Sequence, residues 1–320
     1  MRRVLITGIA GGLARQVAKE LLSRGDHVVG VDYRELKNRE PELKDLEVFQ
    51  ANYNKTVIED IFRKNSFTHV LHLGRVGNLK ESSGKRFDLN VVGSQKIMNL
   101  CVQHGVTRLV VMSTFHIYGA HPANHIPISE EEPLRAGMDF PQLADAIQLD
   151  NMAATWVWRH EDVHVCVLRP TNVIGPMLRN TISELLRQPT IPRLLGFDPM
   201  MQFLHEKDLA DAIVLACDKE QRGIFNVTGR GVIPWTTAIE IAGSKSIPLP
   251  SSAVRFAVKY FSALPEYLVN FFKYPCVISD KAFCDSFGYQ ARVSIAQSIE
   301  TTVAEARELA RQKLLAKHSR

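Results

Sequence analysis

The sequence predicts an α/β fold in which a doubly wound parallel sheet carries a smaller, irregular C-terminal lobe. Three observations support this prediction. Short β-rich runs alternate with helical patterns through the first half, a glycine-rich turn follows the first run, and prolines punctuate the second half. Repeated strand–helix–strand units form parallel sheets with helices on both faces, because their crossovers are right-handed.

The expected strands are short runs of apolar and β-branched residues. They lie at Val4–Thr7, His27–Val31, Leu46–Gln50, Thr68–Leu73, Arg108–Met112 and Val163–Leu168. A helical stripe covers residues 17–22, and further helical patterns lie near residues 55–64, 87–104 and 143–160. Residues 1–170 are therefore expected to form one sheet domain.

After Pro170 the pattern loosens into short helices separated by prolines. Gly223–Val227 has the pattern of one more strand, which we expect to return to the main sheet. Residues 171–320 should otherwise form the smaller lobe. The chain ends in a helix over about residues 294–317, and its final Lys and Arg residues suit the negative end of the helix dipole.

Composition excludes several classes of protein. The 39 Lys and Arg residues against 34 Asp and Glu residues give a net charge of +5 without a clustered basic face, which argues against nucleic-acid binding. The five cysteines form no Cys-x-x-Cys pair, which argues against a disulfide framework or a zinc site and favours the cytoplasm. No apolar run is long enough for a transmembrane segment.

The first strand leads directly into a glycine-rich turn, Thr7–Ala14, and then into a helix. Glycines allow a tight turn and a close approach of a pyrophosphate to the backbone, as in Rossmann-type dinucleotide-binding domains. An acidic residue, Asp32, closes the second strand, where a ribose-binding carboxylate is expected. Asp32 favours NAD over NADP, although Arg34 could soften this preference. The cofactor contacts expected here are Gly8, Gly11, Gly12, Leu13 and Asp32.

A series of motifs along nearly the whole chain resembles the extended short-chain dehydrogenase/reductase family, of the NAD-dependent epimerase/dehydratase type. The motifs are Thr7–Ala14, His72–Arg75 (similar to His-Leu-Ala-Ala), Asn90–Ser94, Ser113–Gly119, Leu168–Pro176 and Phe203–Ala210 (similar to Phe-Val-His-Val-x-Asp-Leu-Ala). The resemblance implies further cofactor contacts at Leu73, Gly74, Asn90, Ser113 and Pro170. It also implies substrate contacts at Asn172 and Arg179, and a homodimer formed through the helices near 87–104 and 143–160.

The chain departs from this family where the chemistry is expected. The family places a Tyr-x-x-x-Lys pair on the helix after the fifth strand, and here Gln142 and Ala146 occupy those positions. Neither side chain can exchange a proton with a substrate. Thr114 keeps the hydroxyl of the family's catalytic Ser or Thr, and His116 and Tyr118 are candidate replacements for the proton donor. The alternative is that His116 and Tyr118 only pack the loop.

Two functions therefore remain open. The chain is an NAD-dependent oxidoreductase or isomerase acting on a nucleotide sugar or a related hydroxy or keto substrate, or it is a non-catalytic NAD(P)-binding redox sensor or interaction protein. No metal is expected. The aromatic residues of the segment 256–274 pack the small lobe, or alternatively form a wall for an apolar substrate or contact a membrane surface.

Overall fold

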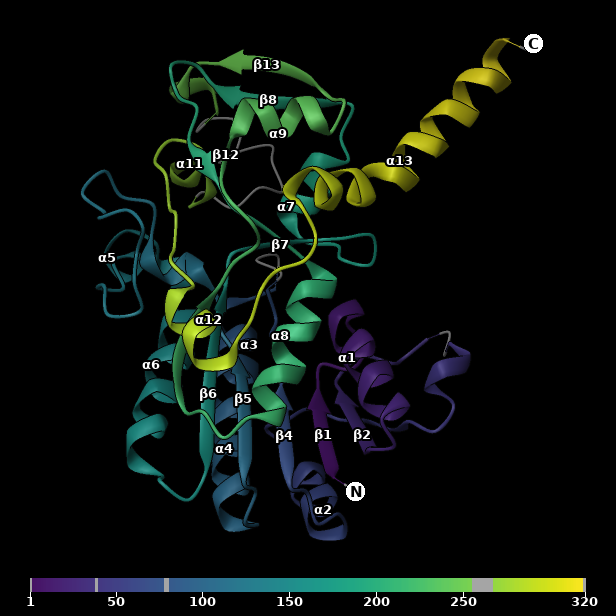
Figure 1. The fold of residues 1–320 in the computed structure, drawn as a ribbon, viewed down its shortest axis with the longest axis vertical. Coiled ribbons are helices and arrows are strands. Elements are labelled where there is room, and N and C mark those ends of the chain that lie inside the picture. Colours follow the sequence, from purple (N-terminus) through teal and green to yellow (C-terminus); the bar gives the residue numbers. More distant parts are fainter. Residues whose placement is uncertain (1, 38–39, 78–80, 255–266, 319–320) are drawn as a thin grey trace.

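A central sheet of seven parallel strands organises the computed structural model, which describes residues 2–37, 40–77, 81–254 and 267–318 (Figure 1). The strand order is β11-β6-β5-β4-β1-β2-β3. The bounds are β1 Arg3–Thr7, β2 His27–Asp32, β3 Glu47–Gln50, β4 His69–His72, β5 Arg108–Met112, β6 His164–Pro170 and β11 Gly223–Val227. The order reverses between β1 and β4, and ligands of such sheets bind at this point, beyond the carboxyl ends of the strands.

Helices cover both faces of the sheet because each strand buries side chains on both sides. Val4 and Ile6 belong to the core that includes α1 and α8, whereas Leu5 belongs to the core that includes α2, α4 and α6. Helix α8 also packs against α1. The bounds are α1 Gly12–Ser23, α2 Val57–Lys64, α3 Ser83–Phe87, α4 Ser94–Gln103, α5 Ala136–Asp139, α6 Ala144–Arg159 and α8 Glu206–Asp218.

The predicted α/β architecture is confirmed, and so is the Rossmann-type order of its parallel strands. The helix expected near 87–104 is not uniform, because a π-helical turn, Asp88–Gly93, separates α3 from α4. Short 3₁₀ turns occur at Pro41–Leu43, Phe115–Tyr118 and Pro141–Leu143.

The smaller lobe lies beyond the carboxyl ends of the sheet strands (Figure 1). Its strands form three pairs: β7 Asn172–Ile174 with β10 Phe203–His205, β8 Thr190–Leu194 with β13 Lys245–Leu249, and β9 Met200–Met201 with β12 Ile233–Pro234. Its helices are α7 Thr181–Leu186, α9 Trp235–Ile241, α11 Leu268–Phe271 and α13 Ile295–His318, whereas α12 Lys281–Phe287 packs against β11 of the main sheet. The buried Trp235, Phe203 and Ile299 belong to a core of the lobe's own. Strand β11 pairs in parallel with β6, as the sequence predicts for Gly223–Val227.

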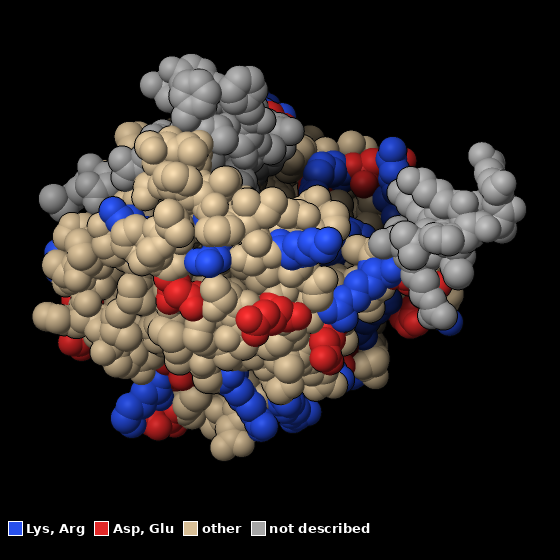
Figure 2. All heavy atoms as spheres, turned by 90° about the horizontal axis from the view of Figure 1, so that it is seen from above, with Lys and Arg blue, Asp and Glu red and all other residues tan. Residues whose placement is uncertain are grey.

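The described surface carries charges of both signs. On the face shown in Figure 2, Lys and Arg side chains are interspersed with Asp and Glu, and no extended patch of one sign forms. Within the described residues, no helix combines the length and hydrophobicity that crossing a membrane requires. The described His, Cys, Asp and Glu residues also form no cluster able to hold a metal ion.

Candidate functional site

A tight turn joins the end of β1 to the start of α1. Gly8 has a φ of +78°, and a Cβ atom built on it would lie 2.5 Å from the Cα atom of Gly74, which follows β4. A Cβ atom on Gly12 would lie 2.9 Å from the carbonyl oxygen of Met177. Among the described residues no side chain caps α1 at Gly11. The first amide groups of α1 and its dipole can therefore act on an anion.

Asp32 ends β2 beside this turn, with only 1% of its surface exposed. Its carboxylate accepts hydrogen bonds from the backbone amides of Ala10, at 3.0 Å, and Arg34, at 2.9 Å. The Arg34 guanidinium also contacts both carboxylate oxygens, at 3.3 and 3.1 Å, and its hydrogen bond to Asp32 raises the pKa of Arg34. The position predicted to bind ribose thus holds a carboxylate and a guanidinium in contact.

A buried hydrogen-bond network supports the strand ends on both sides of the turn. His72 at the end of β4 contacts Thr7 Oγ1 through Nδ1, at 2.8 Å, and Ser94 Oγ through Nε2, at 2.7 Å. The amide of Gly74 donates to Thr7 Oγ1 at 3.1 Å. Burial lowers the pKa of His72 to about 4, so its ring is neutral near pH 7. Leu73, between His72 and Gly74, packs against the core shared with α1.

Asn90, in the π-helical turn, fixes the chain that follows β4. Its Oδ1 atom accepts from the amide of Val76 at 2.8 Å, and its Nδ2 atom donates to the Val76 carbonyl at 3.0 Å. Nδ2 also donates to Asp145 at 2.6 Å. Both amide atoms of Asn90, a predicted cofactor contact, are therefore engaged in holding the backbone that follows β4.

A cavity of about 360 Å³ opens at the carboxyl ends of β5 and β6. The predicted site residues in its lining are Leu13, Ser113, Thr114, His116, Pro170 and Asn172. Leu13 comes from the first turn of α1, so the cavity adjoins the glycine turn. The remaining lining is mostly apolar and includes Met112, Val173, Leu178, Ile182, Leu209 and Leu268.

Thr114 and His116 form a hydrogen-bonded pair in this lining, with 2.9 Å between Thr114 Oγ1 and His116 Nδ1. The His116 ring packs among aromatic rings, with centroids 4.3 Å from Phe115, 4.9 Å from Phe271 and 5.6 Å from Tyr267. Its Nε2 atom is buried and has no hydrogen-bond partner among the described residues. Burial, assisted by the positive charge of Arg75, lowers the pKa of His116 to about 3. The ring is therefore neutral near pH 7.

Tyr118 lies outside the lining of this cavity, in a second buried network. Its hydroxyl donates to Asn226 Oδ1 at 2.8 Å and accepts from Arg169 at 2.8 Å. Arg169 also pairs with Asp150, whose Oδ1 atom accepts from the predicted cofactor contact Ser113 at 2.5 Å. Burial raises the pKa of Tyr118 to about 12. The structure thus gives Tyr118 a packing environment, and it brings Thr114 and His116 together.

The start of α6 presents no titratable side chain at Gln142 or Ala146. Ala146 is buried in the fold, and the Gln142 carbonyl accepts from Arg86 at 3.1 Å. Neither residue lines the cavity. Tyr267, at the start of α11, does line it, and burial raises the pKa of its phenol.

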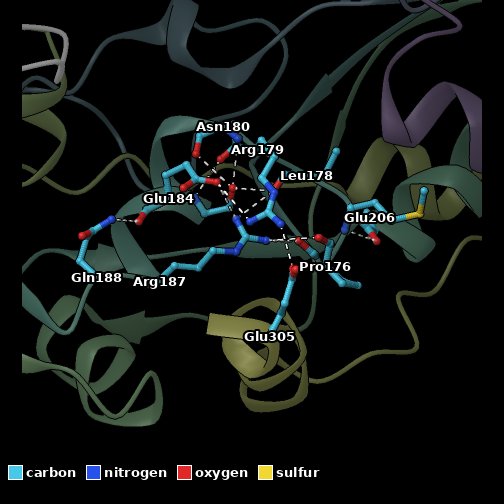
Figure 3. Close-up of polar contacts among 12 residues, drawn as sticks. Pro176, Leu178, Arg179, Asn180, Glu184, Arg187, Gln188, Glu206 and Glu305 are labelled. Carbon is cyan, nitrogen blue, oxygen red and sulfur yellow. Dashed lines mark hydrogen bonds and ion pairs between the residues drawn. The ribbon is translucent and has the colours of Figure 1, made fainter. Parts of the chain in front are cut away.

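The β7–α7 loop, residues 175–180, forms one wall of the cavity through Leu178 and Asn180. Arg187 donates to the carbonyls of Gly175 and Leu178, both at 2.9 Å, and the buried Glu206 accepts from the Met177 amide (Figure 3). Arg179 lies outside the cavity lining, is half-exposed, and pairs with Glu184 and Glu305 (Figure 3). Asn172 lines the cavity and donates to the Gln202 carbonyl at 3.0 Å.

Sequence reasoning missed Arg75, Tyr267, Arg187 and Glu206. Two of them carried a signal, because Arg75 replaces an Ala and Glu206 a Val of the family motifs that the sequence resembles. Tyr267 was noticed only as part of an aromatic segment, of which Phe256, Tyr260, Phe261 and Leu264 lie outside the described residues. No motif in the sequence pointed to Arg187, which bonds to the backbone carbonyls of Gly175 and Leu178 as well as to Glu184.

The matching family model is that of the NAD dependent epimerase/dehydratase family, over residues 4–228. This match spans the sheet, the glycine turn and most of the cavity lining. The chain belongs to the NAD-dependent epimerase/dehydratase family.

Relatives and a solved structure agree with membership of this family. An uncharacterised protein of Mycobacterium tuberculosis is 28% identical over 261 residues, covering 78% of this chain and 68% of that protein. UDP-glucose 4-epimerase 1 of Oryza sativa is 25% identical over 299 residues, covering 78% of this chain and 82% of the enzyme.

The solved structure of a UDP-glucose 4-epimerase from Stenotrophomonas maltophila, with bound NAD and formylated UDP-arabinopyranose, superposes with a TM-score of 0.77. It is 18% identical, and the match covers 98% of this chain and all of that one. At this identity the likeness establishes the shared fold.

Proposed function

We propose that the chain binds NAD at the turn between β1 and α1 and acts as an oxidoreductase or isomerase on a nucleotide sugar or a related hydroxy or keto compound. The observation that carries this proposal is that Leu13, from the first turn of α1, lines the same cavity as Thr114 and His116. The rice relative is a UDP-glucose 4-epimerase, which supports the choice of substrate class.

The residues of the glycine turn fit a dinucleotide. Side chains are excluded at Gly8 and Gly12 by Gly74 and Met177, and the amides of α1 can bind a pyrophosphate. The Asp32 carboxylate accepts hydrogen bonds from ribose hydroxyls and repels a 2′-phosphate, which favours NAD over NADP. Arg34 is the group that opposes this preference. Bound NAD would supply a hydride acceptor or donor.

In this mechanism Thr114 and His116 orient the substrate oxygen. Gln142 and Ala146 stand where the family resemblance places the Tyr and Lys, and neither can titrate. When Thr114 Oγ1 donates to His116 Nδ1, the neutral ring carries its proton on Nε2, which can donate to an oxygen in the cavity. A ring with so low a pKa is a weak base, so its task near pH 7 is to stabilise negative charge on that oxygen.

Calorimetry with NAD and NADP tests the cofactor assignment. Losing hydrogen bonds to a charged group should make NAD binding by Asp32→Ala weaker by roughly tenfold to a hundredfold. Asp60→Ala is the matched control, because Asp60 is an exposed acid on α2 that pairs with Arg63. Failure of the wild-type chain to bind NAD, or equal binding by Asp32→Ala, would refute the assignment.

A panel of UDP sugars and simple hydroxy compounds, followed by NADH absorbance and product analysis, tests the catalytic assignment. The absence of titratable groups at Gln142 and Ala146 favours one rival function, a non-catalytic NAD(P)-binding redox sensor or interaction protein. That rival predicts tight NAD binding, no turnover, and a partner protein whose affinity depends on the cofactor. Gain of activity by Gln142→Tyr with Ala146→Lys would support it.

A cytoplasmic homodimer completes the proposal. Large apolar side chains are exposed on the two helical segments that the resemblance assigns to dimerisation, including Phe87 (45%), Val102 (41%) and Trp158 (76%). The proposed dimer buries Trp158 at its interface. Trp158→Glu should therefore shift the chain to monomer, as measured by light scattering. Glu161→Lys, a charge change just after α6, is the control. A monomeric wild-type chain would contradict the proposal.

A further inference from the structure

The described lining of the cavity carries charge of one sign, whereas the described surface carries charges of both signs. Among the described lining residues, Arg75 is the one that carries a charge at neutral pH, since His116 is neutral there. The other polar groups are hydroxyls, amides and the phenol of Tyr267. No carboxylate of the described residues forms an ion pair with Arg75. A guanidinium in a largely apolar cavity lowers its free energy by pairing with an anion.

The backbone on both sides of Arg75 is held in place. The preceding amide, of Gly74, donates to Thr7 Oγ1. The following residue, Val76, is bonded through both its amide and its carbonyl to the Asn90 side chain. The Cα atom of Arg75 is thus held in position before any ligand binds. This reduces the conformational entropy that the side chain loses on binding.

The described charged groups near Arg75 form no ion pair with its guanidinium. Arg75, His116 and Tyr267 line the same cavity, and the positive charge of Arg75 lowers the pKa of His116 and opposes the rise in the pKa of Tyr267. Asp145 also acts on Tyr267, but this carboxylate already accepts from Asn90 at 2.6 Å and lies 3.7 Å from Arg86. The nearby acid therefore has partners of its own.

We propose that Arg75 is a specificity-determining residue that binds a carboxylate of the substrate next to the oxygen held by Thr114 and His116. The inference rests on the proposed function and narrows its substrate class to acids such as uronic acids or hydroxy acids. A guanidinium can bind a carboxylate through two parallel hydrogen bonds, and this geometry fixes the orientation of the neighbouring carbon. The shared location with His116 assigns Arg75 to the substrate end of the cavity.

Matched pairs of an acid and its neutral alcohol test the inference. Calorimetry on the NAD-loaded chain compares UDP-glucuronic acid with UDP-glucose, and glycerate with glycerol. Charged hydrogen bonds should make the acid of a pair bind at least about tenfold more tightly. Arg75→Gln should abolish this ratio and leave NAD affinity unchanged, whereas Arg75→Lys should keep part of it. Arg63→Gln, an exposed arginine of α2, should change nothing.

Two outcomes would overturn the inference. The first is equal binding of acid and alcohol by the wild-type chain in both pairs. The second is a large loss of NAD affinity in Arg75→Gln with an unchanged ratio, which would assign Arg75 to a phosphate of the dinucleotide. A wild-type chain that binds no NAD counts against the proposed function instead, and titration of glycerate and glycerol without NAD then still tests Arg75.

Discussion

Two histidines differ in how their nitrogens are hydrogen-bonded: His72 ends β4, and His116 follows the carboxyl end of the neighbouring strand β5. Both rings are kept neutral by burial, which lowers their pKa to about 4 and about 3. Both nitrogens of His72 have side-chain partners, Thr7 and Ser94. One nitrogen of His116 bonds to Thr114, and the other has no partner among the described residues.

This difference separates a structural histidine from a candidate functional one. A buried polar atom without a partner costs free energy, so a ligand that completes this hydrogen bond would gain binding free energy from it. His72 joins β1, β4 and α4 and has no capacity left for a ligand. His116 retains that capacity and lines the cavity.

The largest effect should come from His116→Ala. Loss of a hydrogen-bond donor that stabilises negative charge on the substrate oxygen reduces kcat/KM by roughly a hundredfold to a thousandfold. The free energy of unfolding should fall by only about 1 kcal/mol, because mainly aromatic contacts are lost. Steady-state kinetics and urea denaturation measure the two quantities, with the exposed His125→Ala as control. Full activity in His116→Ala would remove His116 from the mechanism.

His72→Ala should show the opposite pattern. It leaves Thr7 and Ser94 hydroxyls without their ring partner and creates a void in the core. The expected loss in the free energy of unfolding is about 2–4 kcal/mol. Ser94→Ala, which removes one of the two contacts, should lose less. Equal stability of the His72→Ala and His116→Ala chains would show that the distinction between the two histidines is wrong.

The effect of pH is smaller when it is counted for one pH unit and one histidine. In the unfolded chain both histidines titrate near pH ~6.5, whereas in the folded chain they stay neutral to much lower pH. The unfolded state therefore binds more protons as the pH falls below ~6.5, and folding stability drops by about 1.4 kcal/mol per pH unit for each such histidine. Above that pH the two states are equally neutral and this contribution is constant.

Urea denaturation at several pH values measures this slope. His72→Gln should have a shallower slope than the wild-type chain, since it has one buried ring fewer. The kcat profile should show no His116 titration near pH ~6.5, because the folded ring titrates far below that value. A kinetic inflection there that disappears in His116→Gln would contradict the low pKa assigned to this ring.

The sequence located the parts of the site that depend on local geometry. Gly8 and Asp32 follow directly from strand ends, and the ends of parallel strands meet at one edge of a sheet. Thr114 follows β5 for the same reason. The parallel arrangement of the sheet could also be predicted, because strand–helix–strand units have right-handed crossovers.

Other parts depend on contacts between distant segments and could not be predicted. The Tyr118 hydroxyl bonds to Asn226, which lies 108 residues later, and this contact decides its packing environment. Asn90 lies in a π-helical turn that the sequence pattern did not indicate, and its side chain bonds to Val76. Tyr267 reaches the cavity from the smaller lobe, and no local pattern distinguishes it from the other aromatic residues of its segment.

The contact between Gly12 and Met177 has a mechanical consequence. Met177 of the β7–α7 loop lies against the first turn of α1, and Leu178 and Asn180 of the same loop line the cavity. This short loop therefore borders both the glycine turn and the cavity. A bulkier residue at position 12 would displace the β7–α7 loop. The cavity would then change shape together with the glycine turn, even though the substitution lies in the turn alone.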